Sequence, residues 1–105
     1  MKLFLDTAII EEIDSRLGSG VISGVTTNPT LIKKSGKNPD DIYADLIQDI
    51  GVKDVSIEVN GQFADQLIEN GIKYGKLWAN EATIKLPCTP EGIKACKMLN
   101  FMGIR

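Results

Sequence analysis

The chain has 105 residues, which fits one compact domain and falls below the ~250 residues typical of a closed eight-stranded α/β barrel. Hydrophobic residues make up 43% and charged residues 25%, which excludes a disordered acidic segment, a collagen-like chain and a disulfide-knotted toxin. Twelve basic and fourteen acidic residues give a net charge of −2, so the positive field typical of nucleic-acid binding is missing. The absence of histidine excludes catalytic triads, zinc sites and proton relays that need an imidazole.

The two cysteines and the first residues indicate where the protein works. Cys88 and Cys96 lack CxxC spacing, so we expect free thiols in a reducing compartment. The apolar run over residues 3–5 stops at Asp6, far short of a signal peptide, and no later stretch is long enough to cross a bilayer. The expected localisation is cytoplasmic, without a membrane partner.

Short strand patterns alternate four times with longer helical patterns, which is typical of βα units and a parallel sheet. The first strand is expected at Leu3–Asp6, followed by a helix that Thr7 caps and Gly18 ends. The second strand is expected at Val21–Val25.

The middle of the chain predicts two helical pieces. A turn at residues 26–29 leads into a short helix at residues 30–34. Asn38 then caps a second helix, with Pro39 in its first turn and Gly51 as its stop. The apolar stripe of this helix consists of Tyr43, Leu46, Ile47 and Ile50.

The last part of the chain repeats the βα pattern twice. We expect a third strand at Asp54–Val59, a helix at Gln62–Tyr74 and a fourth strand at Thr83–Leu86. The final helix starts at residues 89–91 and ends near Gly103, and its apolar stripe is expected to be Ile93, Cys96 and Leu99.

The length of the repeat predicts that this chain is half of a larger assembly. Four units in 105 residues give about 26 residues each, so eight would need roughly 210 residues, a plausible (βα)8 barrel. Four parallel strands cannot close and leave two sheet edges bare. We therefore expect residues 1–105 to be a (βα)4 half-barrel that a second copy or a separate second half completes.

Three charged residues lie at the carboxyl ends of predicted strands, on the face of the sheet opposite the aliphatic side chains. Asp6, Glu58 and Lys85 occupy such positions, because side chains alternate along a strand. The carboxyl ends of parallel strands are where the active sites of α/β proteins lie. The pattern predicts that the three side chains converge at one mouth.

A lysine beside two carboxylates indicates imine chemistry. An ammonium inside a short strand has little access to water, which favours its neutral, nucleophilic form. The amine of Lys85 could then condense with a ketone, while Glu58 and Asp6 move the protons, and no metal or cofactor is needed. The alternative is an ion pair between Lys85 and an acid that only neutralises charge.

Two segments carry a resemblance to a known family. Gly24–Ile32, Gly-Val-Thr-Thr-Asn-Pro-Thr-Leu-Ile, resembles the signature after the second strand of the small transaldolases. Ile84–Ile93, Ile-Lys-Leu-Pro-Cys-Thr-Pro-Glu-Gly-Ile, resembles the segment around their Schiff-base lysine, and Leu3–Thr7 matches their first strand. The resemblance covers the whole chain and implies the TIM (βα)8-barrel fold, of which this chain carries the first four units.

The resemblance also implies roles for individual residues. Lys85 forms the imine, Asp6 is the base on the C4 hydroxyl of the donor, and Asn28 binds the dihydroxyacetone portion. The family's transaldolases carry glutamate at the position of Glu58, where the related fructose 6-phosphate aldolases carry glutamine, and this glutamate handles protons through a water. Thr26 and Thr27 line the same mouth or, equally well, cap the turn with their hydroxyls.

The implied function is transfer of a dihydroxyacetone unit between ketose and aldose phosphates in the pentose phosphate pathway, with no cofactor. Two alternatives stay open: an aldolase of the fructose 6-phosphate type, and a non-catalytic truncated half-barrel that needs a partner. In the family, the last four βα units supply the arginine that binds the sugar phosphate. The expected partners are therefore sugar phosphates, together with a second copy of the chain or a missing carboxyl-terminal half.

Overall fold

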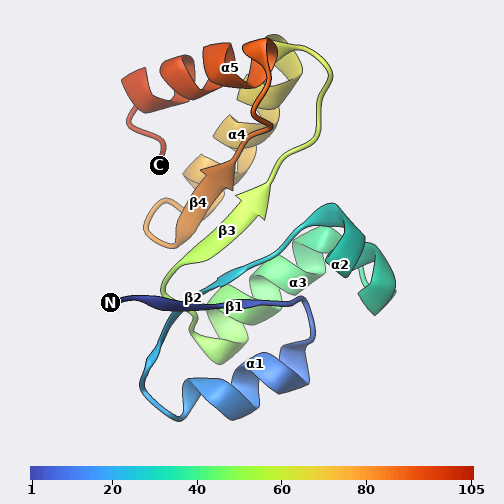
Figure 1. Cartoon of the computed structure of the whole chain (residues 1–105), viewed down its shortest axis with the longest axis vertical. Coiled ribbons are helices and arrows are strands. Elements are labelled where there is room, and N and C mark those ends of the chain that lie inside the picture. Colours follow the sequence, from blue (N-terminus) through green and yellow to red (C-terminus); the bar gives the residue numbers. More distant parts are fainter. The chain divides into compact units, whose positions relative to one another are not determined.

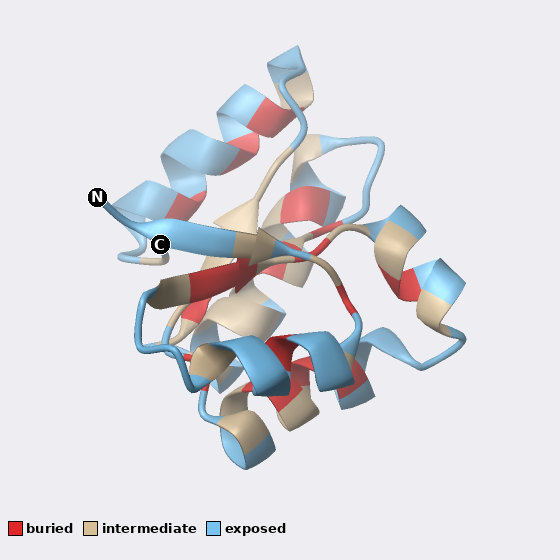
Figure 2. Ribbon diagram, turned by 60° about the horizontal axis from the view of Figure 1, so that its bottom comes forward, coloured by how far each residue is buried: buried red, intermediate tan, exposed pale blue.

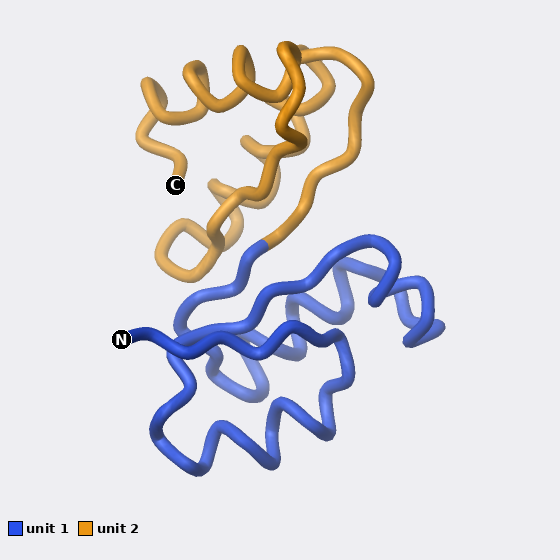
Figure 3. Tube along the Cα trace, viewed as in Figure 1, with its two compact units in different colours: residues 1–56 blue, residues 57–105 orange.

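A computed structural model describes all 105 residues (Figure 1). The chain forms two compact units. Unit 1 comprises residues 1–56 and unit 2 residues 57–105 (Figure 3). The helices and strands follow one another as βα units, and none of the helices is long and apolar enough to cross a membrane.

Unit 1 contains two complete βα units and the start of a third strand. Its elements are β1 (Leu3–Asp6), α1 (Ile10–Leu17), β2 (Ile22–Thr26), α2 (Pro29–Ser35), α3 (Pro39–Ala44) and the π-helix η1 (Asp45–Ile50). The strand β3 (Val55–Glu58) begins in unit 1 and ends in unit 2. Unit 2 continues with α4 (Ala64–Leu77), β4 (Ala82–Lys85) and α5 (Pro90–Phe101).

Hydrogen bonds join the strands in the order β1-β2-β3-β4. β1 pairs parallel to β2, with Asp6 opposite Thr26, and β2 pairs parallel to β3, with Thr26 opposite Ser56. The expected α/β class is thereby confirmed, and the parallel sheet of βα units is consistent with half of a TIM barrel. The four predicted strands are all present, each within one residue of its expected ends.

Each unit buries aliphatic residues of its own, and Figure 2 shows all buried residues in red. In β3, Val55 and Ile57 are fully buried, as the alternation of the sequence predicts. Leu3 in β1 does not follow this pattern, since it is 42% exposed. The fully buried larger aliphatic side chains of unit 1 are Ile13, Val25, Ile42, Leu46, Val52 and Val55, and those of unit 2 are Ile57 and Leu67.

Thr7 does not cap the first helix, so that prediction was wrong. α1 begins at Ile10, its N-cap is Ile9, and no side chain accepts a hydrogen bond there. The Thr7 hydroxyl accepts from the N–H of Ile9 at 3.1 Å and donates to Glu12 at 3.3 Å. A threonine hydroxyl can bond backbone two residues ahead, and here that local turn delays the start of the helix.

The helix that Asn38 opens changes its hydrogen-bonding pattern midway. The N-cap is as expected, since the Asn38 side chain accepts from the N–H of Asp40 at 2.9 Å. After Ala44 the chain continues as the π-helix η1, which ends where Gly51 takes a φ of 82°. The apolar stripe did not distinguish this wider winding from an α-helix.

The final helix buries one of the three residues of the predicted stripe, Leu99, and leaves the other two exposed. Ile93 is 63% exposed and Cys96 is exposed, whereas Gly92, Ala95 and Leu99 are buried. A Cβ on Gly92 would lie 1.8 Å from the Pro87 carbonyl oxygen, so the glycine permits close approach of α5 to the preceding turn. That contact turns Ala95 and Leu99 inward and Ile93 outward.

Candidate active site

Asp6 and Thr26 form a hydrogen-bonded pair at the ends of β1 and β2. The Thr26 hydroxyl donates to Oδ1 of Asp6 at 2.9 Å. The two residues are direct partners in the parallel register, and alternation places them on one face with Phe4 and Gly24. Thr26 therefore holds one carboxylate oxygen of Asp6, a contact that the sequence analysis did not anticipate.

Thr27 directs its hydroxyl into the protein. It is fully buried, and its Oγ1 donates to the carbonyl of Ser56 at 3.1 Å. The backbone N–H of Thr27 donates a second hydrogen bond to the same carbonyl at 3.3 Å. Thr27 thus bonds the backbone of the neighbouring strand β3, and both its contact with substrate and the capping of its own turn stay predictions.

Asn28 serves as the N-cap of α2. Its Oδ1 accepts from the N–H of Leu31 at 2.9 Å, and Pro29 occupies the first helical position. The NH2 group, which carries both donors of this amide, takes no part in the cap.

Lys85 and Glu58 form an ion pair in unit 2. The Lys85 Nζ lies 3.5 Å from Oε2 of Glu58, and the carbonyl of Lys85 accepts from the N–H of Val59 at 3.2 Å. Both side chains extend from the carboxyl ends of their strands and are 37% exposed. Lys85 thus has more access to water in this chain than its place in a strand predicted.

The arrangement gives an amine and a carboxylate on adjacent strands, both accessible to a ligand. A carboxylate at this distance can take up or return a proton at the amine or at a group attached to it. Asp6 and Thr26 belong to unit 1, whereas Glu58 and Lys85 belong to unit 2. The convergence of these two pairs at one mouth stays a prediction.

Comparison with known proteins assigns the family. The model of the transaldolase/fructose-6-phosphate aldolase family matches residues 3–105. The chain belongs to this family.

Curated relatives match this transaldolase-family chain over all or nearly all of its residues. A probable transaldolase from Coprothermobacter proteolyticus is 44% identical over 104 residues, which cover 99% of this chain and 47% of the relative. A probable transaldolase from Herpetosiphon aurantiacus is 41% identical, covering 100% and 47%, and one from Geotalea daltonii is 44% identical, covering 100% and 48%. The chain therefore spans about half the length of the curated relatives that it matches.

The turn after Lys85 in this transaldolase-family chain is held by backbone contacts. The N–H of Thr89 donates to the carbonyl of Pro87 at 2.9 Å, and the Thr89 hydroxyl accepts from the N–H of Gly92 at 3.1 Å. Gly92 packs against Pro87 without a side chain between them. These contacts fix the direction in which the chain leaves the strand that carries Lys85.

Glu91 supports the same turn from α5. Its Oε2 accepts from the N–H of Ala64, the first residue of α4, at 2.8 Å, and its Oε1 accepts from Nζ of Lys94 at 2.7 Å. The hydrogen bond from Lys94 and then the one from Ala64 lower the pKa of Glu91, and the same bond raises the pKa of Lys94. An acid early in a helix was visible in the sequence, but its partner on another helix was not.

Proposed function

We propose that this chain carries the covalent chemistry of a transaldolase, with Lys85 as the nucleophile. The observation that carries the proposal is the 3.5 Å contact between Lys85 and Glu58, both accessible at the ends of adjacent strands. Membership in the transaldolase/fructose-6-phosphate aldolase family supports it.

The proposed reaction begins with attack of the neutral Lys85 amine on the ketone carbon of a ketose phosphate. The carbinolamine loses its hydroxyl as water and becomes a protonated imine, with Glu58 supplying the proton through a water molecule. The imine then accepts the electron pair of the breaking C3–C4 bond, while Asp6 removes the proton of the C4 hydroxyl. An aldose phosphate leaves, and a three-carbon enamine stays bound to Lys85.

Transfer reverses these steps on a second aldose phosphate. The enamine carbon attacks the acceptor aldehyde, the new hydroxyl takes its proton from Asp6, and water hydrolyses the imine with help from Glu58. Asn28 is proposed to bind the dihydroxyacetone portion through its NH2 group. Thr26 is proposed to hold Asp6 in place, because its hydroxyl bonds the carboxylate.

The proposed role of the whole protein is transfer between ketose and aldose phosphates in the pentose phosphate pathway of the cytoplasm. The names of the curated relatives favour transfer, since they are probable transaldolases. The family description also includes fructose-6-phosphate aldolase, so simple cleavage is the second candidate. Glu58 favours transfer over cleavage by the resemblance stated above.

Borohydride trapping tests the nucleophile directly. Incubation of the chain with fructose 6-phosphate and borohydride should reduce the imine and leave a stable adduct, which peptide mass spectrometry should locate on Lys85. The Lys85→Arg variant is the control and should show no adduct. An unmodified intact mass, or an adduct spread over other lysines, would overturn the assignment of Lys85.

A further inference from the structure

The loop that follows β3 is bonded to the first turns of α4. The carbonyl of Asn60 accepts from Nδ2 of Asn70 at 2.7 Å. Oε1 of Gln66 accepts from the N–H groups of Gln62 and Phe63 at 2.8 and 3.3 Å. Because Gln66 and Asn70 both belong to α4, a shift of this helix also moves the loop at the carboxyl end of β3.

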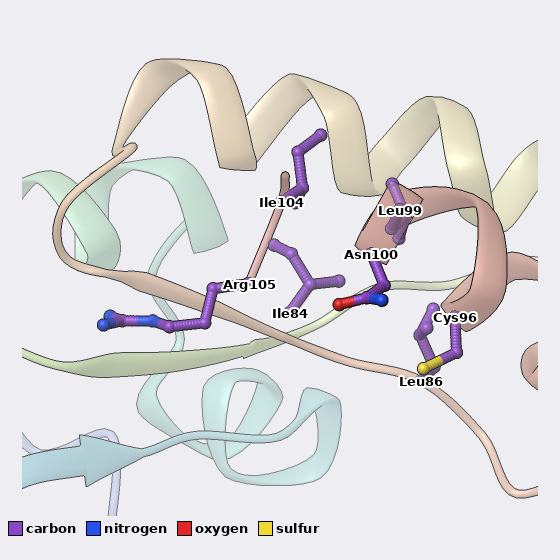
Figure 4. Close-up of a pocket in the computed structure, with 7 residues that line it drawn as sticks. All are labelled: Ile84, Leu86, Cys96, Leu99, Asn100, Ile104 and Arg105. Atoms are coloured by element: carbon purple, nitrogen blue, oxygen red, sulfur yellow. The ribbon is translucent and has the colours of Figure 1, made fainter. Parts of the chain in front are cut away.

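The packing of β4 against α5 contains a cavity. Ile84 and Leu86, the neighbours of Lys85 in sequence, line an apolar pocket of about 230 Å³ (Figure 4). Cys96 and Leu99 of α5 also line this pocket. Side chains leave the space unfilled, and close packing is what normally holds two elements in register. Apolar packing alone therefore leaves β4 some freedom to shift relative to α5.

Glu91 joins the starts of α4 and α5. It is the second residue of α5, and its Oε2 accepts from the N–H of Ala64, the first residue of α4, at 2.8 Å. The side chain of Glu91 is 30% exposed, and a negative charge is favourable near the amino end of a helix. Since α4 follows the loop after Glu58 and α5 follows the turn after Lys85, this hydrogen bond connects the segments that leave the two strands.

We propose that Glu91 is a positioning residue that keeps Glu58 and Lys85 at the separation that imine formation needs. The inference rests on the proposed function, and Glu91 acts only through the other two side chains. β3 and β4 have four residues each, so the loops have a large influence on where the strands end. A shift of either end changes the 3.5 Å separation of Nζ and Oε2, and a displacement of about 1 Å can slow a reaction ~10²-fold.

Two substitutions break this link from its two ends. Glu91→Ala removes the carboxylate, whereas Ala64→Pro removes the N–H and places proline at the first position of α4, where proline is well tolerated. Each should slow borohydride trapping of fructose 6-phosphate at Lys85 about tenfold, and the double variant should be no slower than either single variant. Circular dichroism should show that the variants fold. Trapping as fast in both single variants as in the unmodified chain would overturn the inference.

Two more substitutions at the same place separate the link from the neighbouring ion pair. Glu91→Gln keeps a side-chain oxygen that can accept from Ala64, so it should restore most of the trapping rate. Lys94→Ala removes the 2.7 Å bond from Lys94 to Glu91 and leaves the bond to Ala64, so it should trap as fast as the unmodified chain. Slow trapping by Lys94→Ala, or equal rates for Glu91→Gln and Glu91→Ala, would contradict the proposed link.

A double-mutant cycle tests whether Glu91 acts through Glu58. In the Glu58→Gln chain the amide cannot exchange a proton, so adding Glu91→Ala should slow trapping less than about twofold. A tenfold slowing in this background as well would assign Glu91 a purely structural role and overturn the inference.

Hydrogen exchange tests the link without any adduct. The Val59 amide donates to the carbonyl of Lys85 at 3.2 Å and should exchange about tenfold faster in Glu91→Ala, because the two strand ends separate more often. Unchanged exchange would contradict the link between the strand ends. Absence of any Lys85 adduct from the unmodified chain, with faster Val59 exchange in Glu91→Ala, would instead overturn the proposed function and leave the link between the strands established.

Discussion

Lys85 and Glu58 are the pair on which the proposed chemistry depends. Their side chains meet at 3.5 Å, yet each is 37% exposed, so the pair is open to solvent and to a substrate. An exposed ion pair contributes little to stability. The contact therefore adds little to the stability of the fold, and its proposed role in moving protons at the amine needs a direct test.

Replacement of Glu58 by glutamine should slow imine formation at Lys85. The amide cannot exchange a proton during loss of water, so we expect borohydride trapping to slow about tenfold or more, as general acid–base catalysis contributes ~10²–10⁴-fold. Asp6→Asn is the control, because Asp6 is proposed to act only when the carbon–carbon bond breaks. Equal trapping rates for Glu58→Gln and the unmodified chain would contradict the role of Glu58.

Gly92 is the residue at which packing space is most sharply limited. A methyl group there would meet the Pro87 carbonyl oxygen at 1.8 Å, so Gly92→Ala should lower the free energy of unfolding by about 1–3 kcal/mol. Gly18 has a helical φ of −59° and no atom within 4 Å of its would-be Cβ. Gly18→Ala should therefore raise the same free energy by ~0.4–1 kcal/mol, and urea unfolding would measure both changes.

Among the elements, α4 and α5 are joined by the carboxylate of Glu91. One of its oxygens caps the first turn of α4 and the other bonds Lys94 on α5. Glu91→Gln should lower the midpoint of thermal unfolding at neutral pH. Glu69→Gln is the matched control on the exposed surface of α4 and should cause little change.

The pH dependence of this effect follows from the two pKa shifts. The pKa of Glu91 is lowered from 4.5, so its contribution is present above pH 4.5 and is lost as the pH falls through the lowered value. The pKa of Lys94 is raised from 10.5, so its contribution is present below pH 10.5 and is lost as the pH rises through the raised value. The difference in melting midpoint between the chain and Glu91→Gln should be largest between these limits. A difference that grows in acid would contradict the assignment.

At the scale of the whole molecule, the feature with the largest expected effect on activity is the length of the chain compared with that of its relatives. The chain spans about half of the curated relatives, and by resemblance the other half supplies the arginine that binds the sugar phosphate. We therefore expect imine trapping by the chain alone but little transfer of the three-carbon unit. Addition of the remaining half of a relative should raise transfer by about 10²-fold or more, because correct positioning can change rates by that amount.

A coupled assay of the acceptor product would measure this transfer. The Lys85→Arg chain mixed with the same second half is the control, and it should stay inactive because every proposed step passes through Lys85. Efficient transfer by the 105-residue chain alone would show that contacts between the second half and the sugar phosphate are unnecessary.

The sequence by itself predicted the order of strands and helices, the parallel class and the family. These features depend on local patterns: alternation in β3, the Asn38 and Thr89 caps, and the Lys85 segment can all be found within a few residues. The alternation also placed Lys85 and Glu58 on the same face of their strands, and their ion pair agrees with that placement.

The tertiary structure alone decided which groups that are far apart in the sequence form hydrogen bonds with each other. The Thr26 hydroxyl reaches Asp6 across twenty residues, and Glu91 reaches Ala64 across twenty-seven. The choice of Ala95 rather than Ile93 for the core followed from the close contact between Gly92 and Pro87. Such contacts arise from the distance and direction between elements, and a periodic pattern within one element carries no information about either.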